Sequence, residues 1–222
     1  MEKSEGNLIP KRLLGKTGDV VSILGLGGEG LLRTYGQGQE ATSLIHRAID
    51  LGLTYFESAR AYAGSESYYG TALGERRKEI FLASKSHERT LDGASGHLEA
   101  TLKNMKTDFL DLWMVHDVRT IKDINQIFGP QGAIRAFESA RRNKLVKWIG
   151  ISGHRNPTIL FLNPTQEHLK SPFTPAYRQA GFPSPPAYRQ AGTGERSVRL
   201  ETEEGVRGVC INLKSYGPVC YF

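Results

Sequence analysis

The chain has 222 residues, 39% of them hydrophobic and 23% charged, and no stretch approaches the roughly 18 apolar residues that a membrane span requires. The net charge of +6 is spread along the chain without a basic stripe or recognition motif, which argues against a nucleic-acid partner. The polar start at Met1–Gly6 resembles no targeting peptide, and the two cysteines, Cys210 and Cys220, predict neither a metal framework nor a disulfide scaffold. We therefore expect a cytoplasmic globular protein without a metal site.

The chain begins with a predicted β-hairpin. Two short segments, Lys11–Leu14 and Val20–Val21, flank the loop Gly15–Asp19. Glycine is favoured where a tight turn needs a positive φ, and the loop holds one near each end. We expect this hairpin to precede the main sheet.

Five buried strands are expected after the hairpin. Each contains a short apolar run, as strands that are covered on both faces do. Most of these runs end in one or two polar residues, which is typical of a strand whose end faces a reaction site. The expected strands are Ser22–Gly28, Thr54–Glu57, Ile80–Ser84, Phe109–His116 and Val146–Ser152.

Helices are expected between these strands. In the first of them apolar residues recur at helical spacing, and Gly52 stands at its C-terminal end. The expected helices are Gln39–Gly52, Ser65–Leu73, Gly96–Met105 and Gln131–Asn143. Strands that alternate with helices predict an α/β fold with a parallel sheet.

Such a sheet belongs either to a doubly wound fold or to a (β/α)8 barrel. A dinucleotide-binding doubly wound fold would open a helix with G-x-G-x-x-G, and the glycines between Gly25 and Gly30 do not have that spacing. A barrel places its chemistry at the C-terminal ends of successive strands, where this chain has polar residues. For residues 1–160 we predict a partial (β/α)8 TIM barrel of about five βα units with an N-terminal β-hairpin.

The composition changes near Pro157. Eight of the ten prolines lie between there and the C-terminus, and the heptapeptide PAYRQAG occurs at Pro175–Gly181 and again at Pro186–Gly192. Because proline and glycine interrupt helices, we expect residues 161–222 to form an irregular tail rich in these two residues, with residues 164–200 disordered. One short strand-like piece, Val206–Leu213, is expected within it.

Four residues at or near the strand ends carry the candidate chemistry: Glu57, Tyr62, Lys85 and His116. A free phenol has a pKa of about 10, so Tyr62 would need the ammonium of Lys85 to lower its pKa before it donates a proton efficiently at neutral pH. Glu57 would form an ion pair with Lys85, which would keep the lysine charged and orient its ammonium. His116 would hydrogen-bond a substrate carbonyl, so the set would protonate a carbonyl oxygen while hydride reaches its carbon.

Each of these residues also has an ordinary structural explanation. A tyrosine in a loop is usually a packing residue, and a lysine at a strand end usually meets solvent. Glu57 and Lys85 could form a structural ion pair, and His116 could cap an element beside Asp117. The combination at one end of successive strands is more specific than any of its members.

Taken together, these segments resemble the aldo-keto reductase family. RLLGKTGDVVSILGLGG resembles the family's N-terminal hairpin and first strand, TYFESARAY its tyrosine segment, and ASK its lysine strand. VH in DLWMVHD resembles its histidine strand, and GISGH the segment that contacts the nicotinamide amide. The resemblance covers about residues 11–160.

The resemblance implies roles for single residues. Tyr62 would be the general acid, with Lys85 and Glu57 tuning it and His116 orienting the carbonyl. The cofactor would be NADP, reduced as NADPH, and the partner a small carbonyl compound.

The same resemblance implies a cofactor contact at each of two further positions. Ser152 would hold the nicotinamide, and Gly28 would let the chain pass close to the cofactor. Two residues depart from the family's pattern: Glu57 stands where the family has Asp, and Gly153 where it usually has Asn.

Three further strands of the family have no counterpart after Leu160, and these strands include the basic residues that hold the 2′-phosphate of NADP. We therefore expect a truncated member of the family. The alternative is a non-catalytic fragment without cofactor binding, for which no NADPH binding is expected in calorimetry. A Schiff-base lyase that uses Lys85 with Glu57 is a third reading, which the Tyr62–His116 pair makes a minor one.

Overall fold

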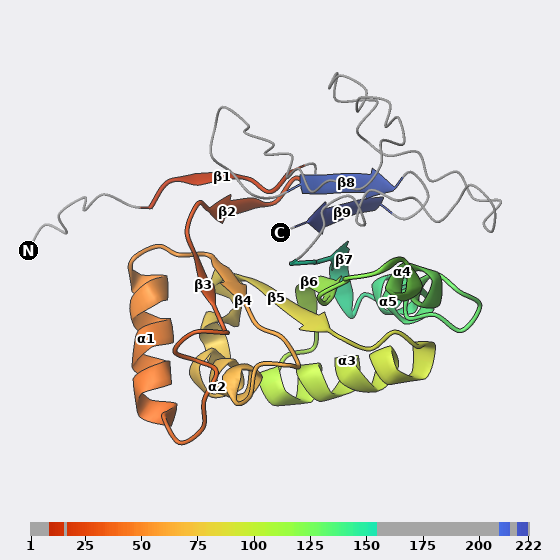
Figure 1. Ribbon diagram of the computed structural model, residues 1–222. Coiled ribbons are helices and arrows are strands. Elements are labelled where there is room, and N and C mark those ends of the chain that lie inside the picture. Colours follow the sequence, from red (N-terminus) through yellow and green to blue (C-terminus); the bar gives the residue numbers. More distant parts are fainter. Residues whose placement is uncertain (1–8, 16, 155–208, 214–216, 222) are drawn as a thin grey trace, which may run out of the picture.

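The structure is a computed structural model, shown in Figure 1. It describes residues 9–15, 17–154, 209–213 and 217–221. Both copies of the heptapeptide and the segment 164–200 lie outside the described residues, so the expectation of a disordered tail there stays a prediction. No helix among the described residues is long and apolar enough to cross a membrane.

Strands and helices alternate over most of the described chain. The strands are β1 (Lys11–Leu13), β2 (Val20–Ser22), β3 (Gly25–Gly27), β4 (Tyr55–Glu57), β5 (Phe81–Ser86), β6 (Leu110–Val115), β7 (Val146–Ile151), β8 (Val209–Leu213) and β9 (Gly217–Tyr221). The helices are α1 (Gly38–Asp50), α2 (Ser65–Ala72), the 3-10 helix η1 (Gly74–Glu79), α3 (Leu91–Met105), α4 (Ile121–Ile127) and α5 (Ile134–Arg142).

The five predicted parallel strands are confirmed. β3 to β7 pair in chain order, each parallel to the next, so their C-terminal ends lie along one edge of the sheet. This arrangement is an α/β partial TIM barrel. The predicted hairpin is confirmed as well, because β1 and β2 pair antiparallel and Gly15 and Gly18 both have positive φ.

The first strand is shorter and more exposed than the sequence predicts. β3 covers only Gly25–Gly27 instead of Ser22–Gly28, and the side chains of Ile23 and Leu24 are more than half exposed. β3 ends the sheet and pairs with β4 alone, so one side of its backbone has no strand against it among the described residues. Its apolar composition therefore does not lead to burial.

Two helix predictions need correction at their starts. α3 begins at Leu91 rather than Gly96 because Thr90 caps it, accepting a hydrogen bond from the backbone N–H of Gly93. The region around Gln131 forms α5 only from Ile134, and α4, which the prediction omitted, precedes it. Thr120 and Asp123 make a capping box that starts α4.

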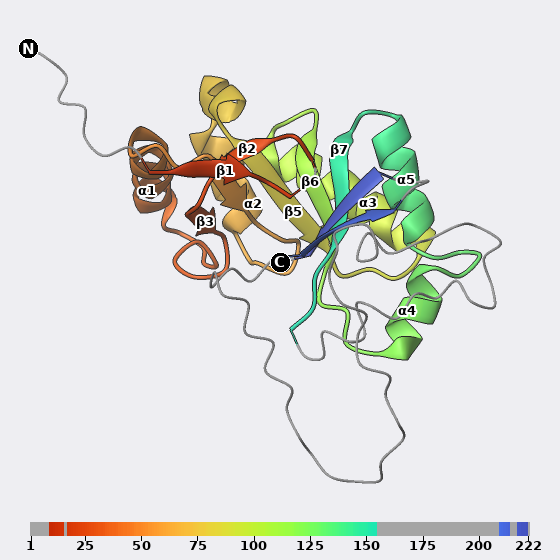
Figure 2. The same ribbon diagram turned by 90° about the horizontal axis from the view of Figure 1, so that it is seen from above.

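The sheet is covered on both faces. Helices α1, α2, α3 and α5 pack on one face, and Figure 1 shows the β1–β2 hairpin on the opposite side. Seen from above in Figure 2, the hairpin crosses over the sheet. Leu14 and Val21 of the hairpin segment form a second apolar cluster with sheet residues Phe81, Leu112 and Met114. Burial on both faces explains the continuous apolar runs of β5 and β6.

β8 and β9 extend the sheet past β7. β9 pairs parallel to β7, and β8 pairs antiparallel to β9. β8 lies within the predicted piece Val206–Leu213, whereas β9 was not predicted. Gly217 and Pro218 at its start make β9 hard to predict from composition.

Candidate active site

The candidate residues lie along the edge formed by the C-terminal ends of the strands. Glu57 ends β4, Lys85 precedes the last residue of β5, and His116 follows β6. The loop after β4 folds back onto β5, since the N–H groups of Ser58 and Arg60 donate to carbonyl oxygens of β5 at 2.9 and 3.0 Å. The local backbone therefore fixes where the Tyr62 loop begins.

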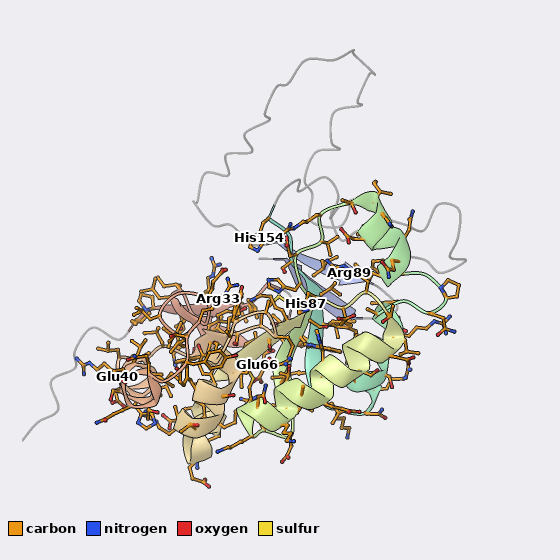
Figure 3. All side chains as sticks on the ribbon, turned by 60° about the horizontal axis from the view of Figure 1, so that its bottom comes forward. Arg33, Glu40, Glu66, His87, Arg89 and His154 are labelled. Atoms are coloured by element: carbon orange, nitrogen blue, oxygen red, sulfur yellow. The ribbon has the colours of Figure 1, made fainter. Side chains whose placement is uncertain are left out.

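Gly64 completes this loop just before α2. Its φ of +78° is one that L side chains rarely adopt, and a Cβ there would lie 1.8 Å from the carbonyl oxygen of Thr34. The neighbouring Arg33 reaches the site, with its Cζ 5.9 Å from the ring centroid of Tyr62. Figure 3 labels Arg33, whose guanidinium also forms an ion pair with Glu29.

Lys85 and Glu57 form an ion pair at the base of the site. Nζ of Lys85 also donates to the carbonyl oxygen of Ser58 at 3.1 Å, and the lysine side chain is almost completely buried. Burial lowers the pKa of Lys85, while the adjacent carboxylate of Glu57 opposes that shift. The predicted pairing of these two residues is thus present in the structure.

Tyr62 lies between Lys85 and His116. Its ring centroid is 4.9 Å from Nζ of Lys85 and 5.6 Å from the centroid of the His116 ring, which it meets edge-on at 90°. The phenol hydroxyl makes no hydrogen bond to any other residue that the structure describes. The hydroxyl is therefore not held directly by Lys85 or His116.

A cavity of about 320 Å³ opens at this edge of the sheet. Three of the four candidate residues line it, and His116, which is buried, does not. The lining residues are Gly27, Glu29, Gly30, Glu57, Tyr62, Lys85, Ser152 and His154. The volume suits a single ring with a small carbonyl compound rather than an entire dinucleotide.

The pKa of Tyr62 departs from the sequence-based expectation. We expected Lys85 to lower it, but burial raises the pKa of Tyr62 above 10.0, and the carboxylates of Glu57 and Glu29 raise it further. Burial is the main cause of the raised pKa, and Lys85 does not offset it because its ammonium is paired with Glu57. Tyr62 is therefore a protonated phenol at neutral pH.

His116 is neutral at pH 7. Burial, and then the positive charge of Lys85, lower its pKa from 6.5 to about 4. Its Nδ1 is buried without a hydrogen-bond partner in the described part of the chain. A neutral imidazole carries one N–H, and no partner at Nδ1 within the described chain fixes which ring nitrogen holds it.

The two predicted cofactor contacts have clear structural roles as well. The hydroxyl of Ser152 accepts from the N–H of Asp117 at 3.1 Å and donates to the carbonyl oxygen of Val115 at 3.3 Å, which ties the end of β7 to the end of β6. At Gly28 a Cβ would lie 2.3 Å from Oγ of Ser65, so glycine is required there for packing. Their contacts with a cofactor stay predictions.

Sequence reasoning missed part of the cavity lining. Glu29 and Gly30 follow β3 directly, and His154 follows β7, with its ring centroid 6.3 Å from that of His116. Their position just after strand ends was the available signal.

Comparisons with known proteins show the family of the chain. The model of the aldo/keto reductase family matches residues 23–172. The chain is 30% identical over 164 residues to the uncharacterized oxidoreductase YqkF of Bacillus subtilis, covering 68% of this chain and 50% of that protein. It is also 30% identical over 162 residues to the aldo-keto reductase yakc [NADP(+)] of Schizosaccharomyces pombe, covering 65% and 45%.

Solved structures give the same result. The holo form of aldo-keto reductase AKR11C1 from Bacillus halodurans superposes with a TM-score of 0.59 at 27% identity, covering 69% of this chain and 53% of that one. The chain spans about half the length of the curated relatives that it matches.

Proposed function

This chain belongs to the aldo/keto reductase family of oxidoreductases, and we propose that its site reduces aldehydes or ketones to alcohols with NADPH as the hydride source. The observation that carries the proposal is the placement of Tyr62 at the cavity, with the Lys85–Glu57 pair beneath its ring and His116 at its edge. The substrate is a small carbonyl compound, and no nucleic acid or membrane takes part.

In this proposal Tyr62 is the proton donor. Its raised pKa keeps the phenol protonated until a carbonyl oxygen gains negative charge beside it. Once the proton leaves, the phenolate lies close to the ammonium of Lys85, which is the only lysine or arginine that lines the cavity among the described residues. Glu57 holds that ammonium in place and offsets the cost of burying it.

His116 orients the substrate. Because its imidazole is neutral, it donates a hydrogen bond to the carbonyl oxygen without competing with Tyr62 as an acid. Its ring meets the Tyr62 ring edge-on with the centroids 5.6 Å apart, which places the imidazole beside the proton donor although His116 does not line the cavity. The alcohol forms when the carbonyl carbon receives hydride and the oxygen receives the Tyr62 proton.

The described residues fit the nicotinamide end of a cofactor. Gly27 and Gly30 line the cavity with open space where a Cβ would be, which leaves room for a flat ring. A bound dihydronicotinamide would supply the hydride, with Ser152 beside it. Lys85 is already paired with Glu57, so no free cation at the cavity, within the described chain, neutralises the phosphates of a dinucleotide.

The lack of a free cation at the cavity, within the described chain, favours a second candidate function. A chain that spans about half the length of its relatives and offers no free cation for the cofactor phosphates could be a non-catalytic fragment that does not bind NADPH. The two candidates differ in one respect that can be measured. The first requires protein-dependent hydride transfer to a carbonyl, and the second excludes it.

A pair of hydride donors separates the candidates. We propose to follow the oxidation of NADPH, and of a phosphate-free N-alkyl dihydronicotinamide, with a panel of small aldehydes in the presence of the purified chain. Carbonyl-dependent oxidation is expected with both donors. Their efficiencies should agree within about tenfold, since the described site offers the phosphates no additional ion pair.

Other outcomes are equally informative. If neither donor is oxidised at any aldehyde concentration, the reductase proposal fails and the fragment is the better description. If NADPH is far more efficient than the phosphate-free donor, the chain holds a phosphate site outside the described residues, and the fragment candidate fails.

A further inference from the structure

We propose that His87, Glu88 and His97 form a binding site for a divalent transition-metal ion such as Zn²⁺. His87 and Glu88 lie in the segment that connects β5 to α3, and His97 lies on α3. Figure 3 labels His87 and Arg89 in this connection. None of the three residues lines the cavity described above, so the proposal is independent of the reductase function.

The three side chains already converge. One ligand atom from each lies within 4.8 Å of the other two, and Nε2 of His97 is 3.8 Å from Oε1 of Glu88. The two imidazole rings meet at 70° with their centroids 4.7 Å apart. Tetrahedral Zn²⁺ with bonds of about 2.0–2.2 Å places its ligand atoms roughly 3.4 Å apart. The exposed side chain of His87 can supply the remaining movement of about 1 Å by rotating.

Ser86 orients the ring of His97 for metal binding. Its Oγ lies 2.9 Å from Nδ1 of His97, and Ser86 itself is completely buried at the end of β5. When Nδ1–H donates to this hydroxyl, the lone pair of His97 is on Nε2, which faces Glu88. A hydrogen bond of this kind from the second ring nitrogen fixes the orientation of metal-bound histidines.

The carboxylate of Glu88 is positioned independently. Its backbone N–H donates to Oγ of Ser86 at 3.2 Å, and its Oε2 lies so close to Gly93 that a Cβ there would be 2.5 Å away. Gly93 belongs to the first turn of α3, where the helix dipole favours a negative charge. Glycine at this position therefore makes room for a carboxylate.

The nearby cations are engaged elsewhere. Arg89 pairs with Asp123 and donates to the carbonyl oxygens of Asp117 and His87, and Arg60 pairs with Glu66, so neither guanidinium pairs with the carboxylate of Glu88. Among the described residues, no lysine or arginine forms an ion pair with Glu88, whose Oε1 lies 3.8 Å from Nε2 of His97. Two imidazoles and a carboxylate match the ligand preference of Zn²⁺ and leave one position for water.

Calorimetric titration of the full-length, tag-free chain with ZnCl₂ tests the proposal. The wild type is expected to bind one ion, and His87→Asn, His97→Asn and Glu88→Gln are each expected to weaken binding by at least about tenfold. The matched control is Glu99→Gln, which removes the same charge from an exposed position on α3 and should leave Zn²⁺ affinity unchanged. NMR of the histidine rings in the wild type should show Zn²⁺-induced shifts at His87 and His97.

The NMR experiment keeps the test decisive even if a variant fails to fold, because it uses the wild type alone. The proposal is overturned if the wild type does not bind Zn²⁺, or if the Zn²⁺-induced shifts spare the rings of His87 and His97. It is also overturned if both histidine variants keep wild-type affinity. In that event a thiolate-to-metal charge-transfer band with Co²⁺ would assign the ion to Cys210 or Cys220 instead.

Discussion

At the scale of single residues, His116 shows how burial sets a charge state. The side chain is almost fully buried next to the Lys85 ammonium, and both factors hold its pKa near 4. In the unfolded chain the same imidazole returns to a pKa of 6.5. The unfolded state therefore binds more protons than the folded state between pH 6.5 and about 4, and stability falls as the pH drops through this range.

His116→Gln should remove this part of the acid sensitivity. Between pH 7.5 and 5 the wild type is expected to lose on the order of 1 kcal/mol more than the variant, after discounting for solvent screening. The measurement is the free energy of unfolding in urea at both pH values. An identical loss in the two proteins would show that His116 protonates as easily in the folded state as in the unfolded one.

The residue types at the site could be predicted from sequence, but their electrostatics could not. Glu57, Tyr62 and Lys85 stand near strand ends in the printed sequence, and their proximity follows from a parallel sheet. The direction of the Tyr62 pKa shift depends on burial and on the pairing of Lys85 with Glu57. Both are properties of packing that a linear pattern does not contain.

At the scale of elements, helices α2 and α3 cross at very close range. Gly70, near the C-terminal end of α2, leaves no room for a side chain, because a Cβ would lie 2.0 Å from the carbonyl oxygen of Asn104. Close to this crossing, Glu66 of α2 is buried and accepts hydrogen bonds from Thr101 and Asn104 of α3. It also accepts from Ser84 of β5, so one carboxylate ties two helices to the sheet.

Two glycine substitutions test this crossing against helix propensity. Gly70→Ala should destabilise the protein by more than about 1 kcal/mol, because the clash with backbone outweighs the gain in propensity. Gly96→Ala, on α3 where a Cβ would meet nothing within 4 Å, should instead stabilise it by about 1 kcal/mol. Urea midpoints of both variants measure the difference. Equal effects of the two substitutions would contradict a close approach at Gly70.

The starts of α3 and α4 are set by N-terminal capping residues, which can be recognised in the sequence. Thr90 starts α3 ahead of Gly93 and Gly96, two residues that lower the helix propensity of its first turns. The Thr120–Asp123 box starts α4, a short helix with isoleucines at Ile121, Ile124 and Ile127. The caps therefore locate the start of α3 and indicate α4, which helix propensity alone does not.

At the scale of the whole molecule, the order of the strands was predictable and the burial of each strand was not. Alternation of strands and helices fixes the parallel order β3 to β7, because crossover connections place successive strands side by side. Exposure at β3 depends on which strand lies at the edge of the sheet. No local pattern around Leu24 carries that information, since it depends on what lies beyond the sheet's edge.

The proposed function depends most on Tyr62 as the proton donor in carbonyl reduction. The most direct measurement is aldehyde-dependent oxidation of a dihydronicotinamide by the wild type and by Tyr62→Phe, with Tyr35→Phe as the control because Tyr35 is 75% exposed. We predict that Tyr62→Phe loses roughly 10²–10⁴-fold in turnover, while Tyr35→Phe matches the wild type. Turnover by Tyr62→Phe equal to that of the wild type would contradict the account.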